Sequence, residues 1–586
     1  MEKKQITLQI DRHYITVPEG ATILEAARKI GIDIPTLCHI DLKGTCIKNN
    51  PASCRICVVE VEGRRNLAPA CATRCTEGMV VRTSTLRVMN ARKVVAELIL
   101  SDHPNDCLTC PKCGNCELQT LALRFNIRTM PFNGGELSPR KREVTSSIVR
   151  NMDKCIFCRR CESVCNDVQT VGALGAIRRG FNTTIAPAFD KMMTDSECTY
   201  CGQCVAVCPV GALTERDHTN RLLEDLANPD KVVIVQTAPA VRAALGEEFG
   251  LPPGTLVTGK MVYALRELGF DYVFDTDFAA DLTIMEESNE LLARLQQPDK
   301  YSWPMFTSCC PGWVSFAKSQ YPELLPQLST AKSPQQMFGA VIKTYFAQKK
   351  GIAPENITCV SIMPCMSKKR ELTLPGMDSA GTGQDIDYVL TTREICRLIK
   401  ADHIDVSRLP ECDFDDPLGE ATGAGVIFGA SGGVLEAALR TAYHTVTGEN
   451  PEIDEQSPLK VLRQIGSFKE LEIDIKGVKL HCAALSSLGE ARRLIQAMKR
   501  GECHYDFVEV MACPGGCING GGQPIRPSFQ NKPKDCADRD QCLRAYDVNS
   551  AIRFSHENQA VQTLYDEYLE APLSDRAHHL LHVEEY

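Results

Sequence analysis

Residues 155–165 read CIFCRRCESVC, and residues 198–209 read CTYCGQCVAVCP. Each stretch has three cysteines separated by two residues and a fourth cysteine three residues further on. Turns with this short spacing let three thiolates converge on one iron–sulfur cubane, and soft thiolates are suited to such iron. Zinc ligands or free thiols are the alternative interpretation, which the duplicated spacing disfavours.

The two stretches together have the spacing of two-cluster ferredoxins, in which the fourth cysteine of each run binds the other cluster. We therefore expect a βαββαβ-type two-cluster ferredoxin-like domain over residues 145–219. One [4Fe–4S] cluster is expected on Cys155, Cys158, Cys161 and Cys208. The other is expected on Cys198, Cys201, Cys204 and Cys165.

The cysteine count is the unusual feature of the composition. The chain has 586 residues and 30 cysteines, of which 18 lie between Cys38 and Cys208. The length predicts several domains. A disulfide scaffold is typical of short secreted chains and fits this chain badly, which leaves metal ligands and reduced thiols.

Charge and hydropathy exclude several classes of partner. Lys and Arg number 65 against 74 Asp and Glu, a net charge of −9 that argues against a nucleic-acid-binding protein. We find no signal peptide, no twin-arginine signal and no stretch of about 18 consecutive apolar residues. The expectation is a cytoplasmic protein without a membrane span.

A second group of cysteines lies in the strand-rich segment 1–82, where we expect a β-grasp [2Fe–2S] ferredoxin-like domain. The expected ligands are Cys38, Cys54, Cys57 and Cys71. The first gap is wider than in plant-type ferredoxins, and Cys46 competes for the place of Cys54. We favour Cys54 because its pair with Cys57 leads into a strand, and a zinc site is the alternative.

A third group lies in segment 83–122, whose residues 86–101 have a helical pattern. Three thiolates and one imidazole can hold a [4Fe–4S] cluster. The expected ligands are His103, Cys107, Cys110 and Cys116. Cys113 lies inside the same loop and is the main ambiguity, and a zinc site with three cysteines and one histidine is the alternative.

The pattern changes after Lys231 to apolar strands that alternate with helices. Residues 232–235 and 357–363 are apolar runs typical of buried strands, and 283–296 reads as a helix. This alternation predicts a two-lobed α/β domain over residues 230–530. Residues 531–586 are expected to form a helical tail.

Three cysteine motifs lie in this α/β region. They are TSCCPGW at 307–313, MPCMSKK at 363–369 and MACPGGCINGGGQP at 511–524. Each places cysteine at a strand end beside proline or glycine, and glycine lets the backbone approach a bulky ligand. Spacing alone makes four of these cysteines a plausible metal site: Cys310, Cys365, Cys513 and Cys517.

The three motifs together resemble the signatures of iron-only ([FeFe]) hydrogenases, and the resemblance extends over nearly the whole chain. The N-terminal modules also resemble part of the large iron–sulfur subunit of complex I. Within the family, the chain is most similar to catalytic subunits of multi-subunit, NAD(P)-linked hydrogenases, a group that includes electron-bifurcating enzymes.

The resemblance implies reversible oxidation of H2 to two protons and two electrons at an H-cluster. This cofactor is a [4Fe–4S] cubane bridged to a diiron subsite with CO, cyanide and a dithiolate. The cubane would be held by Cys310, Cys365, Cys513 and Cys517, with Cys517 as the bridge. One [2Fe–2S] and three accessory [4Fe–4S] clusters would complete the cofactor set.

The resemblance also implies roles for the residues around the diiron subsite. Cys309 would be a free thiol that passes protons to the dithiolate, and Lys368 would donate to a cyanide. The residues that would pack against or line the subsite are Met363, Met511, Ala238, Pro239 and Gln335.

Glu287, Glu290 and Arg294 fall on one face of a single helical stretch. On their own they would indicate a solvated face. The family match makes them part of a proton relay from Cys309 through the two glutamates and Ser329, with Arg294 near the outer end. Buried carboxylates on such a route should have raised pKa values.

The implied partners follow from what the chain lacks. Residues 428–433, FGASGG, resemble a phosphate-binding loop only weakly, and we find no P-loop or Rossmann fingerprint. Electrons would therefore pass to ferredoxin or to a separate flavin- and NAD(P)-binding subunit. Maturation proteins are implied because the chain cannot build the diiron unit.

Two other functions remain as alternatives. An electron-transfer subunit like that of complex I would not use the three later motifs. Hydrogen-sensing relatives commonly replace the proton-shuttle cysteine, which is present here as Cys309.

The remaining cysteines and two histidines are interpreted as structural. We expect no ligand role for Cys536 and Cys542, although they could form a labile metal pair, and expect His444 and His481 to be structural. The cysteines expected to be small apolar fillers are Cys46, Cys75, Cys113, Cys359, Cys396, Cys412, Cys482 and Cys503.

Overall fold

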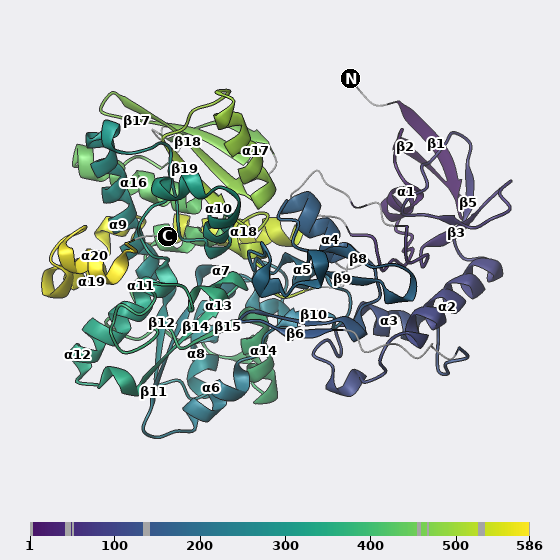
Figure 1. Cartoon of the computed structure of the whole chain (residues 1–586), viewed down its shortest axis with the longest axis horizontal. Coiled ribbons are helices and arrows are strands. Elements are labelled where there is room, and N and C mark those ends of the chain that lie inside the picture. The colour runs from purple at the N-terminus through teal and green to yellow at the C-terminus, as the bar shows by residue number, and fades with distance from the viewer. Residues whose placement is uncertain are drawn as a thin grey trace.

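The computed structural model describes residues 4–40, 49, 52–132, 141–453, 459–465, 468–525 and 534–584. Figure 1 shows the N-terminal sheet at one end, the cysteine-rich segment in the middle and two larger sheets with their helices at the other end. No helix in the described part of the chain is long and apolar enough to cross a membrane.

The N-terminal unit is a five-stranded mixed sheet with one helix. The strand order is β2 (His13–Pro18), β1 (Gln5–Ile10), β5 (Val80–Arg82), β3 (Val58–Val61) and β4 (Ala68–Pro69). β1 runs parallel to β5, and its side chains Leu8 and Ile10 are buried. Helix α1 (Ile23–Lys29) begins with a capping box between Thr22 and Glu25, as its sequence favours.

Helix α2 (Leu86–Ser101) has the bounds expected from the sequence, and it connects this sheet to the next cysteine module. Arg92 on α2 donates from Nε and Nη2 to the carbonyl oxygen of Val58 at 3.1 and 2.8 Å, which fixes the helix against β3. Helix α3 (Glu117–Arg124) follows the His103–Cys116 segment.

The middle segment contains five short strands and two short α-helices, with 3-10 and π turns between them. They are β6 (Arg142–Val144), β7 (Ile148–Asn151), α4 (Arg160–Ser163), β8 (Gly175–Ile177), β9 (Thr184–Ala186), α5 (Gln203–Val207) and β10 (Leu213–Glu215). From β7 to β10 the element order agrees with the expected βαββαβ order. Strand β6 is an addition that lies before residue 145 and pairs antiparallel with β7.

The remaining sheets form the two lobes of the larger region. The first lobe has four parallel strands in the order β12 (Tyr272–Asp275), β11 (Val232–Thr237), β14 (Ile357–Met363) and β15 (Tyr388–Thr391). The second has five strands in the order β13 (Met305–Phe306), β19 (Phe507–Met511), β18 (Val478–Ser486), β17 (Phe468–Ile475) and β16 (Leu459–Ile465). In the second sheet β13, β19 and β18 are parallel.

Helix α9 (Thr276–Gln296) begins seven residues earlier than the 283–296 segment read as helical. Asp275 caps it by accepting a hydrogen bond from the Asp277 backbone, so the helix starts directly after β12. The carboxyl side chains in its first two turns are buried. This part of the helix therefore lacks the alternation of apolar and polar residues by which a helix is recognised in a sequence.

The tail is helical, as expected, and it packs back onto the first lobe. It contains α18 (Lys534–Asn549), α19 (Gln559–Leu564) and α20 (Asp575–Leu581). Leu543 and Leu581 are fully buried, and His582 forms an antiparallel bridge with Ala331. Figure 1 shows the yellow tail lying against α9 and α11 (Pro334–Val341).

Candidate functional site: a line of cysteine clusters ending between two sheets

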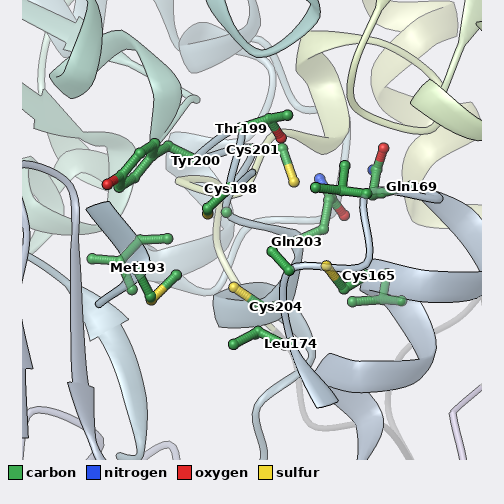
Figure 2. Close-up of a pocket in the computed structure, with 15 residues that line it drawn as sticks. Cys165, Gln169, Leu174, Met193, Cys198, Thr199, Tyr200, Cys201, Gln203 and Cys204 are labelled. Atoms are coloured by element: carbon green, nitrogen blue, oxygen red, sulfur yellow. The ribbon is translucent and has the colours of Figure 1, made fainter. Parts of the chain in front are cut away.

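The second expected ferredoxin set surrounds one enclosed space. Its lining includes Cys165, Cys198, Cys201 and Cys204. Figure 2 shows these four cysteines around the same pocket, with Cys165 coming from the other cysteine run. The structure therefore brings the fourth cysteine of the first run to the second set.

The first set shows the reciprocal arrangement. Burial raises the pKa of Cys161 strongly, and the nearby thiols of Cys158, Cys155 and Cys208 raise it further. Cys208 thus lies with the first run although it belongs to the second. Cys204 also acts on Cys161, so the two ferredoxin sites are neighbours.

The four expected [2Fe–2S] ligands lie together in the N-terminal unit. Hydrogen bonds that the Cys71 thiol donates to Cys38 and Cys57 raise its pKa, and the backbone N–H of Cys54 donates to Cys38 Sγ at 3.5 Å. The competing residue Cys46 lies outside the described residues.

Three of the expected His/Cys ligands, His103, Cys107 and Cys116, line one cavity of about 230 Å³. Burial lowers the pKa of His103, which favours the neutral imidazole that binds metals, and its Nδ1 has no hydrogen-bond partner in the described part of the chain. Cys113 is exposed and is not part of this lining.

Cys110, the fourth expected ligand, is absent from that lining and lies between Cys116 and the first ferredoxin set. Burial raises the pKa of Cys116, and the charge of Cys110 adds to this rise. A Cβ added to Gly211 would lie 2.7 Å from Cys110 Sγ, and Gly211 follows Cys208 by three residues. The buried pair of Arg160 and Glu117, joined by two contacts of 2.8 Å, fixes the two modules against each other.

Four cysteines of the larger region lie at the carboxyl ends of parallel strands, the usual ligand-binding edge of α/β sheets. Cys310 follows β13 and begins α10 (Pro311–Gln320), and Cys365 follows β14. Cys513 and Cys517 follow β19. The site therefore lies between the two lobes.

These four thiols converge. Burial raises the pKa of Cys513 well above its usual value, and the neighbouring thiols of Cys365, Cys201, Cys310 and Cys517 raise it further. Burial likewise raises the pKa of Cys365 to about 12. Bound iron would have to displace these protons, because metals bind the thiolate.

Glycines keep side chains out of this site. A Cβ on Gly520 would lie 2.2 Å from the carbonyl oxygen of Pro364, and Gly516 has φ +97° with a would-be Cβ 2.7 Å from the Ser431 nitrogen. The 511–524 loop thus fits tightly over the Cys365 turn.

Iron–sulfur clusters and single metal ions require different arrangements of thiols. Across the described residues, no group of three or more His, Cys, Asp or Glu side chains is spaced to hold one metal ion. A lone zinc requires four ligands within about 2.3 Å of one point. Cysteines around an iron–sulfur cluster each bind a different iron, so a wider ring of thiols is what such a cofactor requires.

The second ferredoxin site borders this four-cysteine site. Cys513 Sγ lies 4.0 Å from the carbonyl oxygen of Cys201. A Cβ on Gly521 would lie 2.7 Å from Gly202, so the two backbones are in direct contact. From the His/Cys module to the lobes, the cysteine sites form one continuous line.

Lys368 and Gln335 lie beside the four cysteines and are held in place by Glu371. Lys368 Nζ donates to the carbonyl oxygen of Cys309 at 3.1 Å and to Glu371 at 3.1 and 3.2 Å. Gln335 Nε2 donates to Glu371 at 3.0 Å, while its Oε1 is buried without a partner in the described residues. No motif in the sequence singled out Glu371, which stands three residues after Lys368.

The expected lining residues are also at strand ends. Met363 ends β14 and Met511 ends β19, and both are 3% exposed. Ala238 and Pro239 start helix α7 (Pro239–Arg242) directly after β11, and both are buried. All four thus lie at the carboxyl ends of strands, where the cysteines also lie.

The outer half of the expected proton relay is connected by hydrogen bonds. Ser329 Oγ donates to Glu290 Oε2 at 2.8 Å, and Arg294 Nη2 donates to Glu290 Oε1 at 2.5 Å. The backbone N–H of Thr330 also donates to the Glu290 carboxylate, at 3.1 and 3.2 Å.

The inner half consists of Glu287 and Cys309. Burial, followed by the charge of Glu290, raises the pKa of Glu287 to about 8. The Ser329 hydroxyl and the Ser308 backbone N–H lie close to this carboxyl group and offset part of the rise. Burial and then Glu287 raise the pKa of Cys309 well above its usual value, so this thiol is close enough to sense the carboxylate.

The tail supports this relay, which the sequence did not indicate. His582 Nε2 lies 3.0 Å from Glu286 Oε2, and its Nδ1 lies 2.8 Å from Thr330 Oγ1. Tyr565 also donates a short hydrogen bond to Glu286. These contacts hold the segment that carries Ser329 and Thr330.

The glycine-rich loop at 428–433 is not available to a phosphate. The buried carboxylate of Glu509 accepts hydrogen bonds from the N–H groups of Gly432 at 2.6 Å and Leu435 at 2.9 Å. An internal carboxyl group therefore already occupies the N-terminus of helix α16 (Gly433–Thr447).

The residues given structural roles lie mostly apart from the sites. Cys359, Cys396 and Cys482 are buried in hydrophobic cores, as expected of small apolar fillers. Cys536 packs beside the ligand loop, since a Cβ on Gly515 would lie 2.8 Å from its Sγ. His444 stacks on His556 with ring centroids 3.9 Å apart.

Five family models match the chain. They are described as iron only hydrogenase large subunit, C-terminal domain (231–521), 2Fe-2S iron-sulfur cluster binding domain (3–85), NADH-ubiquinone oxidoreductase-G iron-sulfur binding region (92–131), NADH-quinone oxidoreductase subunit 3, ferredoxin-like domain (145–214) and iron hydrogenase small subunit (535–584).

Similar proteins cover the chain from end to end. The NADP-reducing hydrogenase subunit HndD of Solidesulfovibrio fructosivorans is 54% identical and covers 98% of both chains. Iron hydrogenase 1 of Clostridium pasteurianum is 41% identical over 98% of this chain and 99% of its own. A variant of [FeFe]-hydrogenase HydA1 from Chlamydomonas reinhardtii matches in structure with a TM-score of 0.56 and 41% identity, over 63% of this chain and 99% of its own.

Proposed function

Because the chain belongs to the iron-only ([FeFe]) hydrogenase family and is an oxidoreductase of that type, we propose that it is the catalytic subunit of a multi-subunit hydrogenase. It would oxidise H2 reversibly to two protons and two electrons. The observation that carries this proposal is the convergence of four cysteines from three distant segments, with the additional thiol of Cys309 beside them.

Cys310, Cys365, Cys513 and Cys517 would hold the H-cluster, which supplies the metal chemistry that splits H2. Lys368 would provide a positive charge next to it, with Glu371 fixing the direction of its ammonium group. Met363, Met511, Ala238, Pro239 and Gln335 would line the pocket. The unpartnered Oε1 of Gln335 supports a bound group at this position.

Protons would move between Cys309 and the surface through Glu287, Ser329 and Glu290. Ser329 and Arg294 already contact Glu290, so this carboxylate is oriented for exchange. Glu287 would hold a proton at neutral pH because burial raises its pKa to about 8. A carboxyl group that titrates near working pH is suited to passing protons in both directions.

Electrons would leave along the line of cysteine sites. We assign one [2Fe–2S] cluster and three accessory [4Fe–4S] clusters to the sets described above, within domains at 1–82, 83–122 and 145–219. The acceptor would be ferredoxin or a flavin-containing, NAD(P)-binding subunit. The similarity to HndD, described as a subunit of an NADP-reducing hydrogenase, supports the latter.

Infrared spectroscopy of the matured holoenzyme, with iron quantitation, tests this proposal. We expect bands of CO and cyanide ligands, and a Cys309→Ser variant should keep those bands while losing most H2 turnover. Absence of the bands from a correctly matured sample would remove the hydrogenase assignment in favour of a pure electron-transfer subunit. Wild-type turnover in Cys309→Ser would refute the role of this thiol.

A further inference from the structure

Lys154 is a buried lysine that lies between two of the cysteine sites. It directly precedes Cys155, an expected ligand of the first ferredoxin set, and it is 6% exposed. Its ammonium group lies beside Asp106 and Cys110, in the segment that supplies the expected His/Cys ligands. Lysine is almost never buried without a partner, so the groups around Lys154 show what its charge acts on.

The ammonium group of Lys154 is held close to the Cys110 thiol. Its Nζ lies 3.0 Å from Asp106 Oδ2. A Cβ built on Gly211 would lie 2.7 Å from Cys110 Sγ and 3.4 Å from Lys154 Cδ, so the thiol and the lysine side chain meet at the same glycine. Burial lowers the pKa of Lys154, but its interactions with Asp106 and Cys110 outweigh this effect and raise it. Lys154 therefore carries a positive charge beside an expected ligand sulfur.

The backbone of Lys154 contacts a second expected ligand of the same site, His103. Burial lowers the pKa of His103, and the positive charge of Lys154 lowers it further, while a hydrogen bond with the Lys154 backbone offsets part of this change. Histidine ligands are commonly oriented by a hydrogen bond between their other ring nitrogen and a backbone carbonyl. Lys154 thus acts on two ligands of the His/Cys site through separate groups, while the next residue, Cys155, belongs to the neighbouring site.

The other charged groups at this place do not cancel the charge of Lys154. Asp102 and Asp106 act on His103 in the opposite direction to Lys154. The Asp106 side chain is 47% exposed, so water screens its charge, whereas the Lys154 side chain is only 8% exposed. Lys112 is a second cation at the same glycine, with its own Cβ 3.6 Å from the added Cβ. The His/Cys site therefore has a positive environment on the side that faces the ferredoxin-like segment.

We propose that Lys154 raises the reduction potential of the iron–sulfur cluster expected at the His/Cys site. The inference rests on the proposed function, which assigns a [4Fe–4S] cluster to that site, and it adds a residue that directs electrons toward it. A nearby positive charge and a hydrogen bond to a ligand sulfur both stabilise the reduced, more negative state of a cluster. H2 supplies two electrons, and each passes singly: the first ferredoxin site is oxidised as the His/Cys site is reduced. Lys154 makes that transfer more favourable in the direction of H2 oxidation.

A redox titration of the holoenzyme followed by electron paramagnetic resonance tests this role, with the His/Cys signal identified as the one that Cys116→Ala removes. Lys154→Met removes the charge but keeps the apolar stem and the backbone group at His103. We expect its reduction equilibrium at this site to fall at least tenfold, about 59 mV, with the iron content of the wild type. Lys154→Arg keeps the charge and should stay close to the wild type. Lys343→Met is the matched control, because Lys343 is 3% exposed and lies 2.9 Å from Asp387 in the first lobe, and it should leave the potential unchanged.

The outcomes separate this inference from the function on which it rests. An unchanged potential in Lys154→Met with full iron content would overturn the inference, as would an equal fall in Lys154→Arg. If Lys154→Met loses iron, Asp106→Asn decides, because it leaves the charge of Lys154 without its counter-ion. The potential should then rise, and a variant in which it falls or stays constant would overturn the inference. A wild-type enzyme without the signal and its iron would instead overturn the cluster assignment in the proposed function.

Discussion

The hydroxyl group of Ser329 donates a hydrogen bond of 2.8 Å to the carboxylate of Glu290, which lies 39 residues earlier in the sequence. The contact joins helix α9 to the segment that follows β13, because Ser329 also donates its backbone N–H to Phe306 at 2.8 Å. The relay therefore crosses from one lobe to the other at this hydroxyl.

Removing this hydroxyl should interrupt proton transfer without disturbing the cofactor. We expect Ser329→Ala to lower H2 turnover by about a hundredfold or more, the usual range for losing a proton-transfer group. The infrared bands and the iron content should be those of the wild type. Ser315→Ala removes a hydroxyl that only donates to the Pro311 carbonyl, and it should keep full activity. Equal activity in the two variants would contradict the relay.

Glu287 should make stability depend on pH. Below about pH 4 the carboxyl is protonated in the folded and unfolded chains, so it has no effect. Between about pH 4 and 8 only the unfolded chain releases the proton, since the folded pKa is raised to about 8. Stability falls across this window by at most about 1.4 kcal/mol per pH unit and then levels off.

The Glu287→Gln variant tests this dependence. The difference in melting temperature between variant and wild type should increase from pH 5 to pH 8 and change little above it. A Glu355→Gln variant, at an exposed position, should show no such trend. A difference that stays constant across the window would mean that Glu287 titrates normally.

Iron counting can decide between Cys113 and Cys116. Cys116 lines the cavity with His103, whereas Cys113 is exposed outside it. We expect Cys116→Ala to lose about four iron atoms per chain and Cys113→Ala to lose none. The opposite result would transfer the ligand role to Cys113.

The exchange of fourth cysteines between the ferredoxin runs predicts how double variants behave. Cys165→Ser should remove about four irons, and adding Cys201→Ser should remove no more, because both line the same pocket and are assigned to one cluster. Adding Cys158→Ser instead should raise the loss to about eight irons. If Cys165 and Cys158 belonged to the same cluster, the two double variants would exchange results.

The contact between His582 and Glu286 predicts a role for the tail in turnover. His582→Phe leaves the buried carboxylate with fewer partners and frees Thr330, so both thermal stability and H2 turnover should fall, turnover by about tenfold. The exposed neighbour His579→Phe is the control. Wild-type turnover in the His582 variant would show that the tail does not position the relay.

The sequence predicted correctly the helices and strands whose bounds follow from the spacing of neighbouring apolar residues. The bounds of α2 and the strand at 357–363 agree with the structure because both follow directly from apolar spacing. The predicted start of α9 was wrong by seven residues because the carboxylates in its first turns are buried against distant segments. Asp281, for example, accepts hydrogen bonds from Thr422 and Asn558. No spacing in the sequence carries that information.

The candidate site shows the same division. The cysteines could be found because their spacing is fixed by the cofactor, and the relay residues because they form part of a known family pattern. Glu371, Glu509 and His582 could not be found in this way. Glu509 and His582 act through contacts with segments far away in sequence, and the contact of Glu371 with Lys368 belongs to no motif. Pairings of that kind appear only once the chain is folded.

The bridge between His582 and Ala331 has a consequence for folding. His582 follows every cysteine of the chain in sequence, and the bridge joins residues that are 251 positions apart. Because contacts between such distant segments form slowly, the two lobes can collapse around their own cores before this one is made. A folding intermediate without it would have all of its cysteines and still lack a fixed path for its protons.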